Sequence, residues 1–388
     1  MRNIIWSIGY NLKINNIVKA ENCYLYDSSG KQYLDLESGV WCTNVGHCNS
    51  EVNETIKTQI DKIIHTGYCY ANPIIEIAAK KILQLVNMEG GKCEFICSGS
   101  EAVEYGMRIS KAITKQPLTL AFSDSYFGAY GMAQKRDEKE WVIYDWQNCS
   151  CDSDICVGEC KEFKNLPFDK IGVFLFEPGS SSGLIRFPSK SIITKISNKI
   201  KNNNGIVVVN EITTGVGRTG KWFGFQHYDL EPDIVAIGKG IGNGYPVSVT
   251  MISKEVSKKL EKVHFLYAQS HQNDPLGASV ANKVVDIILE RDLIDRSCKL
   301  GKTIIDKLNV LKSNSSLIKE VRGRGLMIAI ELYENASFIQ NKLFEAGFIL
   351  TKRNNSEILR IDPALTIEEK DLDRFLERVT ELLQNRLS

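Results

Sequence analysis

Residues 232–246 read PDIVAIGKGIGNGYP, an apolar run that ends at Lys239 and leads directly into a glycine-rich turn. The run has the length and composition of a short buried strand. Burial disfavours the charged form of a lysine and lowers its pKa, and a neutral amine can attack an aldehyde to form a Schiff base. The glycines carry no Cβ, so the backbone can approach a flat, phosphorylated molecule closely. Lys239 is therefore the first candidate for a catalytic residue.

The composition of the 388-residue chain is that of a globular protein, with 43% hydrophobic residues, 24% charged residues and a formal net charge of +1. This balance predicts no nucleic-acid partner. The apolar stretches are no longer than strands, so we expect no membrane partner either. The N-terminal ten residues lack the apolar core of a signal peptide. Eleven cysteines without a secretion signal are expected to be mostly reduced, in the cytoplasm.

Short apolar runs alternate with stretches of helical periodicity, which favours an α/β fold with a mostly parallel sheet covered by helices. Two helices are expected at 51–65 and 73–86, and a longer one is expected to start near Pro275 and to run past Leu289. An N-terminal hairpin is expected from 23–26 and 32–36. Buried strands are expected at 93–97, 118–122, 171–176, 206–209, 234–237 and 247–252.

The C-terminal part has a different character. Strands are expected at 317–321 and 326–332, around an Arg-Gly-Arg-Gly turn. A final helix is expected to present one apolar face, made of Leu372, Phe375, Leu376, Val379, Leu382 and Leu383.

A second motif precedes the lysine segment, because residues 207–220 read VVVNEITTGVGRTG. Together the two segments resemble the signature of the class III aminotransferases, which bind pyridoxal phosphate, and the resemblance extends from about Tyr24 to Leu376. It implies the type I fold of pyridoxal-phosphate enzymes, with a mixed seven-stranded sheet in a large domain and a small α+β domain. It also implies an N-terminal segment of the small domain at 1–45, a cofactor-binding domain at 46–275, and a linking helix and C-terminal small domain at 276–388.

The resemblance also implies the chemistry. An amino group would move between a small amine or amino acid and a 2-oxo acid through a Schiff base on Lys239, in a homodimer whose two active sites share residues. Gly99 and Ser100 follow a strand and open a helix, where backbone N–H groups bind phosphate. Tyr126 takes the place of a ring that stacks on the pyridine. Arg360 takes the place of an arginine that grips the substrate carboxylate with its planar fork.

Further positions are assigned by the same resemblance. Ser270 of one chain would reach the phosphate in the partner subunit. The remaining cofactor-binding positions are Glu177, Asn210 and Ile212, and the remaining substrate-binding positions are Val40 and Trp41. Two departures alter the expected pocket: Ala129 stands where the family often has a second carboxylate-binding arginine, and serines occupy 180–182, where many relatives carry Gln and Glu.

Asn210 is the largest departure, since the family has an aspartate beneath the pyridine nitrogen. An amide keeps a hydrogen bond but loses a charge contribution on the order of 4 kcal/mol, or up to roughly three pKa units. Glu211 is not expected to compensate, because neighbouring residues in a strand point to opposite faces. We therefore expect a largely unprotonated ring nitrogen. Three interpretations stay open: an aminotransferase, a pyridoxal-phosphate enzyme of another type (epimerase, lyase or carbon–carbon bond chemistry), or a non-catalytic cofactor-binding protein.

Four cysteines lie within twelve residues, at Cys149, Cys151, Cys156 and Cys160. Thiolate clusters bind zinc or iron–sulfur centres. The spacing C-x-C-x4-C-x3-C contains no two-residue zinc knuckle, and the region corresponds to a variable loop of the family. A metal site, a reduced and inert loop, and a redox or disulfide role all remain open.

Overall fold

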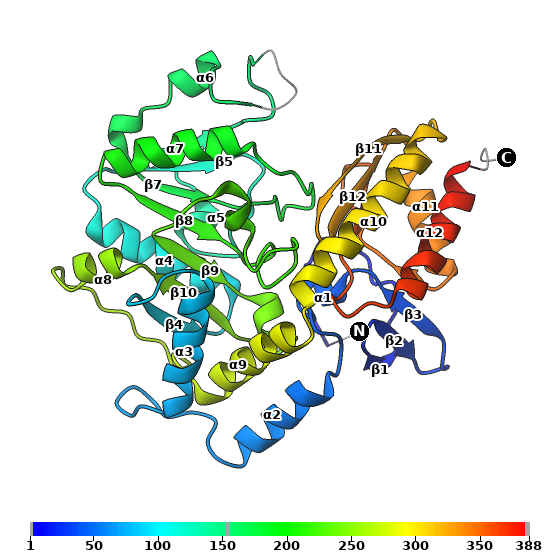
Figure 1. The fold of residues 1–388 in the computed structure, drawn as a ribbon, viewed down its shortest axis with the longest axis horizontal. Coiled ribbons are helices and arrows are strands. Elements are labelled where there is room, and N and C mark those ends of the chain that lie inside the picture. The colour runs from blue at the N-terminus through cyan, green and yellow to red at the C-terminus, as the bar shows by residue number, and fades with distance from the viewer. Residues whose placement is uncertain (1–2, 152–155, 385–388) are drawn as a thin grey trace.

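A seven-stranded sheet forms the centre of the larger of two lobes (Figure 1). The structure is a computed structural model that describes residues 3–151 and 156–384. The strand order is β4 (Lys92–Ile96), β10 (Ser248–Ile252), β9 (Ile234–Ile237), β8 (Ile206–Asn210), β7 (Ile171–Phe176), β5 (Leu118–Phe122) and β6 (Trp141–Tyr144). All neighbouring pairs are parallel except those of β10, which runs antiparallel to β4 and β9. The predicted mixed sheet is confirmed.

The central strands are mostly apolar because helices cover both faces of the sheet. Alternate residues of β8 belong to two separate cores: Val207 and Val209 pack on one side, Ile206 and Val208 on the other. Helix α7 (Lys190–Asn202) packs against β7 and β8 on the first side, and α4 (Gly99–Ile113) crosses β9 and β10 on the second. Helices α2 (Ser50–Ile60), α3 (Pro73–Leu85) and α9 (Pro275–Glu290) pack together, and α8 (Lys254–Leu260) contacts α4.

The smaller lobe combines the two ends of the chain. One sheet has the order β1 (Ile17–Glu21), β2 (Tyr24–Asp27), β3 (Gln32–Asp35) and β13 (Phe348–Ile349), and a second has the order β11 (Ile318–Arg324), β12 (Met327–Leu332) and β14 (Ile358–Ile361). Helices α10 (Leu293–Ser313), α11 (Ala336–Glu345) and α12 (Glu369–Gln384) lie on these sheets (Figure 1). We propose domain boundaries near residues 45 and 275, as the resemblance implies.

Several sequence predictions need correction. The helix expected at 51–65 ends at Ile60, since Ile63 and Ile64 are exposed and have no surface on which to pack. The predicted Arg-Gly-Arg-Gly turn is mostly strand, because β11 continues to Arg324 and the chain reverses at Gly325, whose φ is +54°. Strand β6 and helix α10 were not predicted. Short helices complete the order: α1 (Ser38–Trp41), α5 (Met132–Lys135), α6 (Lys161–Lys164), η1 (Phe168–Lys170), η2 (Gly224–Tyr228) and η3 (Lys239–Gly242).

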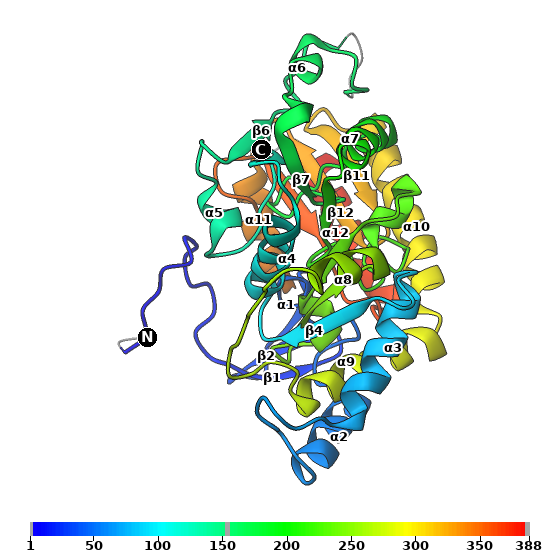
Figure 2. The ribbon, with the colours of Figure 1, turned by 90° about the vertical axis from the view of Figure 1, so that its left-hand side faces the viewer.

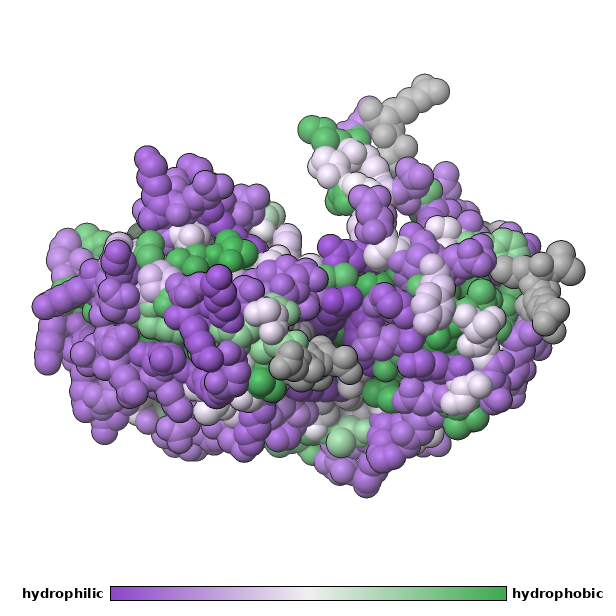
Figure 3. Space-filling view, turned by 90° about the horizontal axis from the view of Figure 1, so that it is seen from above, coloured by the Kyte–Doolittle hydropathy of each residue, from purple (hydrophilic) through white to green (hydrophobic). Residues whose placement is uncertain are grey.

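Residues 3–16, here called the N-terminal arm, contain no helix or strand, and the start of the arm projects from the body of the molecule (Figure 2). Its later residues contact the body, since Lys13 lies over the Phe344 ring and the Gly9 carbonyl accepts from Asn354 Nδ2 at 2.9 Å. The arm exposes large apolar side chains, among them Ile4, Ile5 and Ile8, and Figure 3 shows hydrophobic residues along it. Over the described residues, no helix has the combined length and apolarity of a membrane span.

Candidate active site

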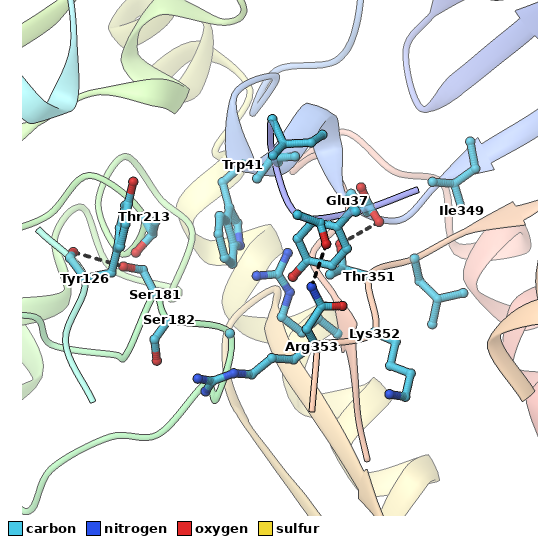
Figure 4. Close-up of a pocket in the computed structure, with 18 of the residues that line it drawn as sticks. Glu37, Trp41, Tyr126, Ser181, Ser182, Thr213, Ile349, Thr351, Lys352 and Arg353 are labelled. Atoms are coloured by element: carbon cyan, nitrogen blue, oxygen red, sulfur yellow. Dashed lines mark hydrogen bonds between the residues drawn. The ribbon is translucent and has the colours of Figure 1, made fainter. Parts of the chain in front are cut away.

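A cavity of about 1120 Å³ lies where the smaller lobe meets the carboxyl ends of the central strands (Figure 4). Ligands bind in α/β sheets at this end of the strands. Residues from both lobes line it, including Glu37, Val40, Trp41, Gly99, Ser100, Tyr126, Ser182, Asn210, Ile212, Thr213, Lys239, Thr351, Arg353 and Arg360. The cavity thus brings together every predicted cofactor- and substrate-binding residue except Glu177, which lies directly behind Asn210, and Ser270.

Lys239 opens η3, two residues after β9 ends. Its φ of +47° is a left-handed conformation, which costs a residue with a side chain roughly 1–3 kcal/mol and is found mainly at functional sites. The Nζ atom lies 5.0 Å from the centroid of the Trp41 ring. Burial lowers the pKa of Lys239, so its amine loses a proton more readily than it would in water.

The start of α4 forms another wall of the cavity. Ser98 and Glu101 cap the helix reciprocally, which leaves the N–H groups of Gly99 and Ser100 at the cavity. A Cβ at position 99 would lie 2.9 Å from the Ile212 side chain, so only glycine lets the helix begin this close to that residue. This geometry suits an anion such as a phosphate.

The side chain of Asn210 is held by three hydrogen bonds. Its Nδ2 donates to Glu177 Oε1 at 3.0 Å and to the Tyr126 carbonyl at 3.1 Å, and its Oδ1 accepts from the Ile212 N–H at 3.1 Å. The partners of Nδ2 are a carboxylate and a carbonyl, and the partner of Oδ1 is an N–H, so the amide orientation is defined. Asn210 has both donors engaged and can only accept a further hydrogen bond.

Glu177 is a buried carboxyl group directly behind Asn210. It also accepts from the N–H of Tyr126 at 3.0 Å, the N–H of Ser181 at 3.3 Å and the Ser181 hydroxyl. Burial raises the pKa of Glu177 to about 8, although these hydrogen bonds oppose the rise. The contact with Asn210 was not predicted from the sequence. The signal for it is that Glu177 and Asn210 end or follow two adjacent parallel strands in matching register, since Phe176 pairs with Val209.

Glu211 points the other way, as expected from strand alternation. It accepts from the N–H groups of Phe225 at 2.7 Å and Gly224 at 2.9 Å and from the Thr214 hydroxyl at 2.6 Å. Its carboxyl group therefore contributes to the core and not to the cavity.

Arg360 lies in β14 and is buried beside Trp41, with its guanidinium carbon 4.0 Å from the ring centroid. The nearest acid is Asp362, whose Oδ2 is 3.5 Å from Arg360 Nε. Trp41 and Val40 belong to a left-handed turn with φ of +64° and +60°, and such a conformation is especially strained for a β-branched residue. This turn places the aromatic ring next to both Arg360 and Lys239.

A second arginine at the cavity, Arg353, was not predicted. Its side chain extends toward the loop that carries Ser182 (Figure 4). Among the described residues its buried Nη1 atom has no hydrogen-bond partner. Burial lowers the pKa of Arg353, and the charge of Arg360 adds to the effect. The Lys352–Arg353 pair shortly before Arg360 is the sequence signal that could have indicated it.

Ser270 does not line the cavity of its own chain. The four cysteines of the 149–160 region, by contrast, do converge, with all four sulfur atoms within 4.8 Å of one another.

These residues fit pyridoxal phosphate. The cavity contains a desolvated lysine, a capped helix start for a phosphate, and the hydroxyls of Ser182 and Thr213, which are buried without partners among the described residues. When bound, the cofactor supplies an electron-withdrawing ring that acidifies the substrate carbon next to nitrogen.

Comparison with known proteins supports this interpretation. The family model of the class III aminotransferases matches residues 8–383. The acetylornithine aminotransferase of Methanocaldococcus jannaschii is 30% identical, over 94% of this chain and 92% of its own. The leucine/methionine racemase of Thermococcus litoralis is 28% identical, over 93% and 89%.

The solved structures agree on the fold. An S-selective transaminase from Arthrobacter sp. superposes with a TM-score of 0.89 and 22% identity, over 100% of this chain and 97% of that one. The chain belongs to the class III aminotransferase family and is a pyridoxal-phosphate-dependent aminotransferase.

Proposed function

We propose that the enzyme acts on small amino acids or amines and 2-oxo acids whose carboxylate binds Arg360, with Lys239 as the Schiff-base lysine and the residue that moves the proton. One observation carries this proposal: the Trp41 ring contacts both groups, with its centroid 5.0 Å from Lys239 Nζ and 4.0 Å from the Arg360 guanidinium carbon. A carboxylate on Arg360 would therefore hold the neighbouring carbon of a small substrate near the lysine. Burial lowers the pKa of Lys239, which favours the neutral amine that can accept a proton.

The cavity also favours a substrate with a second acidic group. Arg353 faces it with an unpartnered Nη1 among the described residues, and the neighbouring cation Arg360 is stacked on a ring and not hydrogen-bonded to an acid. Glu37 is the acidic side chain that lines the cavity, and it accepts a hydrogen bond from Thr351 at 2.5 Å. Arg353 would provide the second carboxylate contact that Ala129 cannot. A dicarboxylic 2-oxo acid is thus the proposed amino acceptor.

Asn210 and Glu177 are proposed to keep the ring nitrogen of the cofactor protonated, contrary to the expectation from the sequence. Because Asn210 has no donor left, a ring nitrogen that contacts it can form a hydrogen bond only if the nitrogen carries a proton. The ionised form of Glu177 would supply the negative charge one hydrogen bond further away, because a positively charged ring nitrogen would lower the pKa of this carboxyl group from the value of about 8 that burial gives it.

A homodimer is proposed as the functional unit. Ser270 lies outside the cavity of its own chain. The neighbouring His271 and the more distant His65 both hydrogen-bond Asp274, at 2.7 and 2.5 Å. Exposed apolar side chains occur at 63–70, next to Ser270 and in the N-terminal arm: Ile63, Ile64, Tyr68, Tyr70, Leu266, Ile4 and Ile5. A partner subunit would cover them and receive Ser270 at its phosphate. We also propose a cytoplasmic location, where eleven free thiols would stay reduced.

A spectral screen tests the proposed function. Purified enzyme is mixed with single amino acids and then with 2-oxo acids, and transamination should convert the cofactor to its amine form and back. Borohydride reduction before digestion should label Lys239. Racemisation of an amino acid without that conversion would contradict the proposal and place the enzyme's activity with that named for the Thermococcus litoralis relative.

A further inference from the structure

The sulfur atoms of Cys149, Cys151, Cys156 and Cys160 are arranged as the ligands of a single metal ion. Cys151 Sγ is 3.8 Å from Cys156 Sγ, Cys156 Sγ is 3.9 Å from Cys160 Sγ, and all four sulfurs lie within 4.8 Å of one another. A tetrahedral zinc site with Zn–S bonds of about 2.3 Å has sulfur–sulfur edges of roughly 3.8 Å. Two of the six sulfur–sulfur edges therefore match a four-thiolate site, and none of the others is longer than 4.8 Å. We propose that these cysteines bind one structural zinc ion.

The surroundings of the four sulfurs support metal binding through burial and nearby hydrogen-bond donors. Cys156 and Cys160 are buried in the main core, and Cys149 and Cys151 pack against it. The Gly158 N–H donates to Cys156 Sγ at 3.4 Å. The Tyr144 hydroxyl, at the end of β6, lies 3.1 Å from Cys156 Sγ and 3.2 Å from Cys160 Sγ. Such outer donors stabilise metal-bound thiolates.

The distances also discriminate among thiol chemistries. An iron–sulfur cluster places several iron and sulfide ions between its cysteines and would hold the thiolates further apart than 4.8 Å. Disulfides need bond lengths of about 2.05 Å, well below the 3.8 Å and 3.9 Å observed, and every cysteine of the chain is free. A set of four sulfurs in this arrangement fits zinc best among common divalent ions.

The region has a physical need for such a metal. The described residues between β6 and η1 contain one regular element, the single-turn helix α6, and Figure 1 shows it at the margin of the larger lobe. Segments with little core of their own are commonly held by a metal or by disulfides. The ion would attach this loop to the surface formed by Tyr144 and by the start of α7. There, the N-cap residue Ser189 already donates from Oγ to the Cys156 carbonyl at 2.5 Å.

The loop is connected to the active site at its beginning. Gln147 Nε2 donates to Asp124 at 2.8 Å, Trp146 Nε1 donates to the same carboxyl group at 3.3 Å, and Gln147 Oε1 accepts from Arg186. Asp124 lies two residues before Tyr126, and Tyr126 lines the cavity. A structural zinc ion would therefore support the wall that carries Tyr126.

The experiment measures metal in the untagged holoenzyme by mass spectrometry, with release by a mercurial reagent followed in a zinc-indicator assay. The expected result is roughly one zinc per chain, and less than a tenth of that in a Cys151→Ser/Cys156→Ser variant. The control is Cys298→Ser, an exposed cysteine far along the chain, which should keep the full zinc content. Cobalt replacement in the unmutated enzyme should give the absorption of a tetrahedral thiolate site.

Four outcomes would overturn the proposal. The unmutated enzyme could hold no zinc and take up neither zinc nor cobalt, or it could hold iron with inorganic sulfide at this site. The denatured enzyme could show four fewer titratable thiols than its eleven cysteines, which would mean disulfides, or the double variant could keep its zinc. The measurements on the unmutated enzyme keep the test valid even if the double variant does not fold.

Discussion

Replacement of Glu177 by glutamine is predicted to remove the proton from the ring nitrogen of the bound cofactor. In the structure, Glu177 accepts the Asn210 amide N–H, so Asn210 presents only its oxygen for a further contact. A glutamine at 177 can still accept the Asn210 N–H through its amide oxygen, so the Tyr126 carbonyl and the Ile212 N–H keep the Asn210 amide in its present orientation. The substitution therefore removes only the negative charge that stabilises a protonated ring nitrogen.

The electrostatic part of the effect follows from the distances. Glu177 Oε1 and Asn210 Nδ2 are 3.0 Å apart, so a donor bound to Asn210 Oδ1 would lie roughly 7 Å from the carboxylate at ordinary hydrogen-bond lengths. At an effective dielectric constant of about 20, two unit charges at that distance attract by about 2.4 kcal/mol. This corresponds to roughly 1.7 pKa units of the ring nitrogen, or about a 50-fold change in the ratio of its protonated and neutral forms.

The assay is nitrogen NMR of enzyme loaded with 15N-labelled pyridoxal phosphate, recorded over a pH series. The unmutated enzyme should show a protonated ring nitrogen at neutral pH, and Glu177→Gln should lower the pKa of that nitrogen. Glu211→Gln is the matched control, because Glu211 is an equally buried carboxyl group whose partners lie on the opposite side of the strand. It should leave the nitrogen unchanged.

Two results would refute the reasoning. One is an unprotonated nitrogen in the unmutated enzyme, which would mean that the original expectation from Asn210 was right. The other is a protonated nitrogen that survives in Glu177→Gln with an unchanged pKa, which would mean that another group supplies the charge.

Three further predictions concern the same cavity. Arg353→Ala should raise KM for a dicarboxylic 2-oxo acid about tenfold or more, which corresponds to about 1.4 kcal/mol, and should leave KM for a monocarboxylic one nearly unchanged; equal effects in steady-state assays would argue against a second carboxylate site. Ser270→Ala should weaken cofactor binding in a spectroscopic titration while dimers persist in ultracentrifugation, and a monomer with full cofactor affinity would contradict the shared site. Since burial lowers the pKa of Lys239 in the folded state, its charge penalises folding most below that lowered pKa, and the penalty disappears as the pH rises to 10.5, the usual pKa of a lysine. Urea unfolding of cofactor-free enzyme should therefore show Lys239→Met more stable than the unmutated protein at neutral pH, with the difference shrinking towards pH 10.5, and a constant difference would be the contrary result.

Much of the central sheet was predictable because burial on both faces leaves a clear pattern in the sequence. The bounds of β5, β7 and β9 agree with prediction to the residue, since each is a mostly apolar, buried run, interrupted in β5 only by Thr119. Strand β6 escaped prediction because it has four residues at the edge of the sheet, and one of them, Ile143, is 45% exposed.

The hydrogen bonds of the site were less accessible than the strands that carry it. Which residues end the strands is a local property, and so Lys239 and Asn210 could be selected as candidates. Which carboxyl group meets Asn210 depends on the register between β7 and β8, and the orientation of the amide depends on three partners from three segments. Arg353 lies in a loop between β13 and β14, where no periodicity indicates the direction of a side chain.

The structure changes what an aspartate at position 210 would mean in this chain. Its carboxyl group would lie about where Asn210 Nδ2 now lies 3.0 Å from Glu177 Oε1, and two carboxyl groups that close share one proton. The pair would then carry one negative charge, as Glu177 alone does in its ionised form. Asn210→Asp should therefore shift the ring nitrogen's pKa far less than the roughly three units that removal of an isolated partner charge implies. A large rise in that pKa, measured by the same NMR titration, would show that Glu177 is neutral in the loaded enzyme and that Asn210 acts alone.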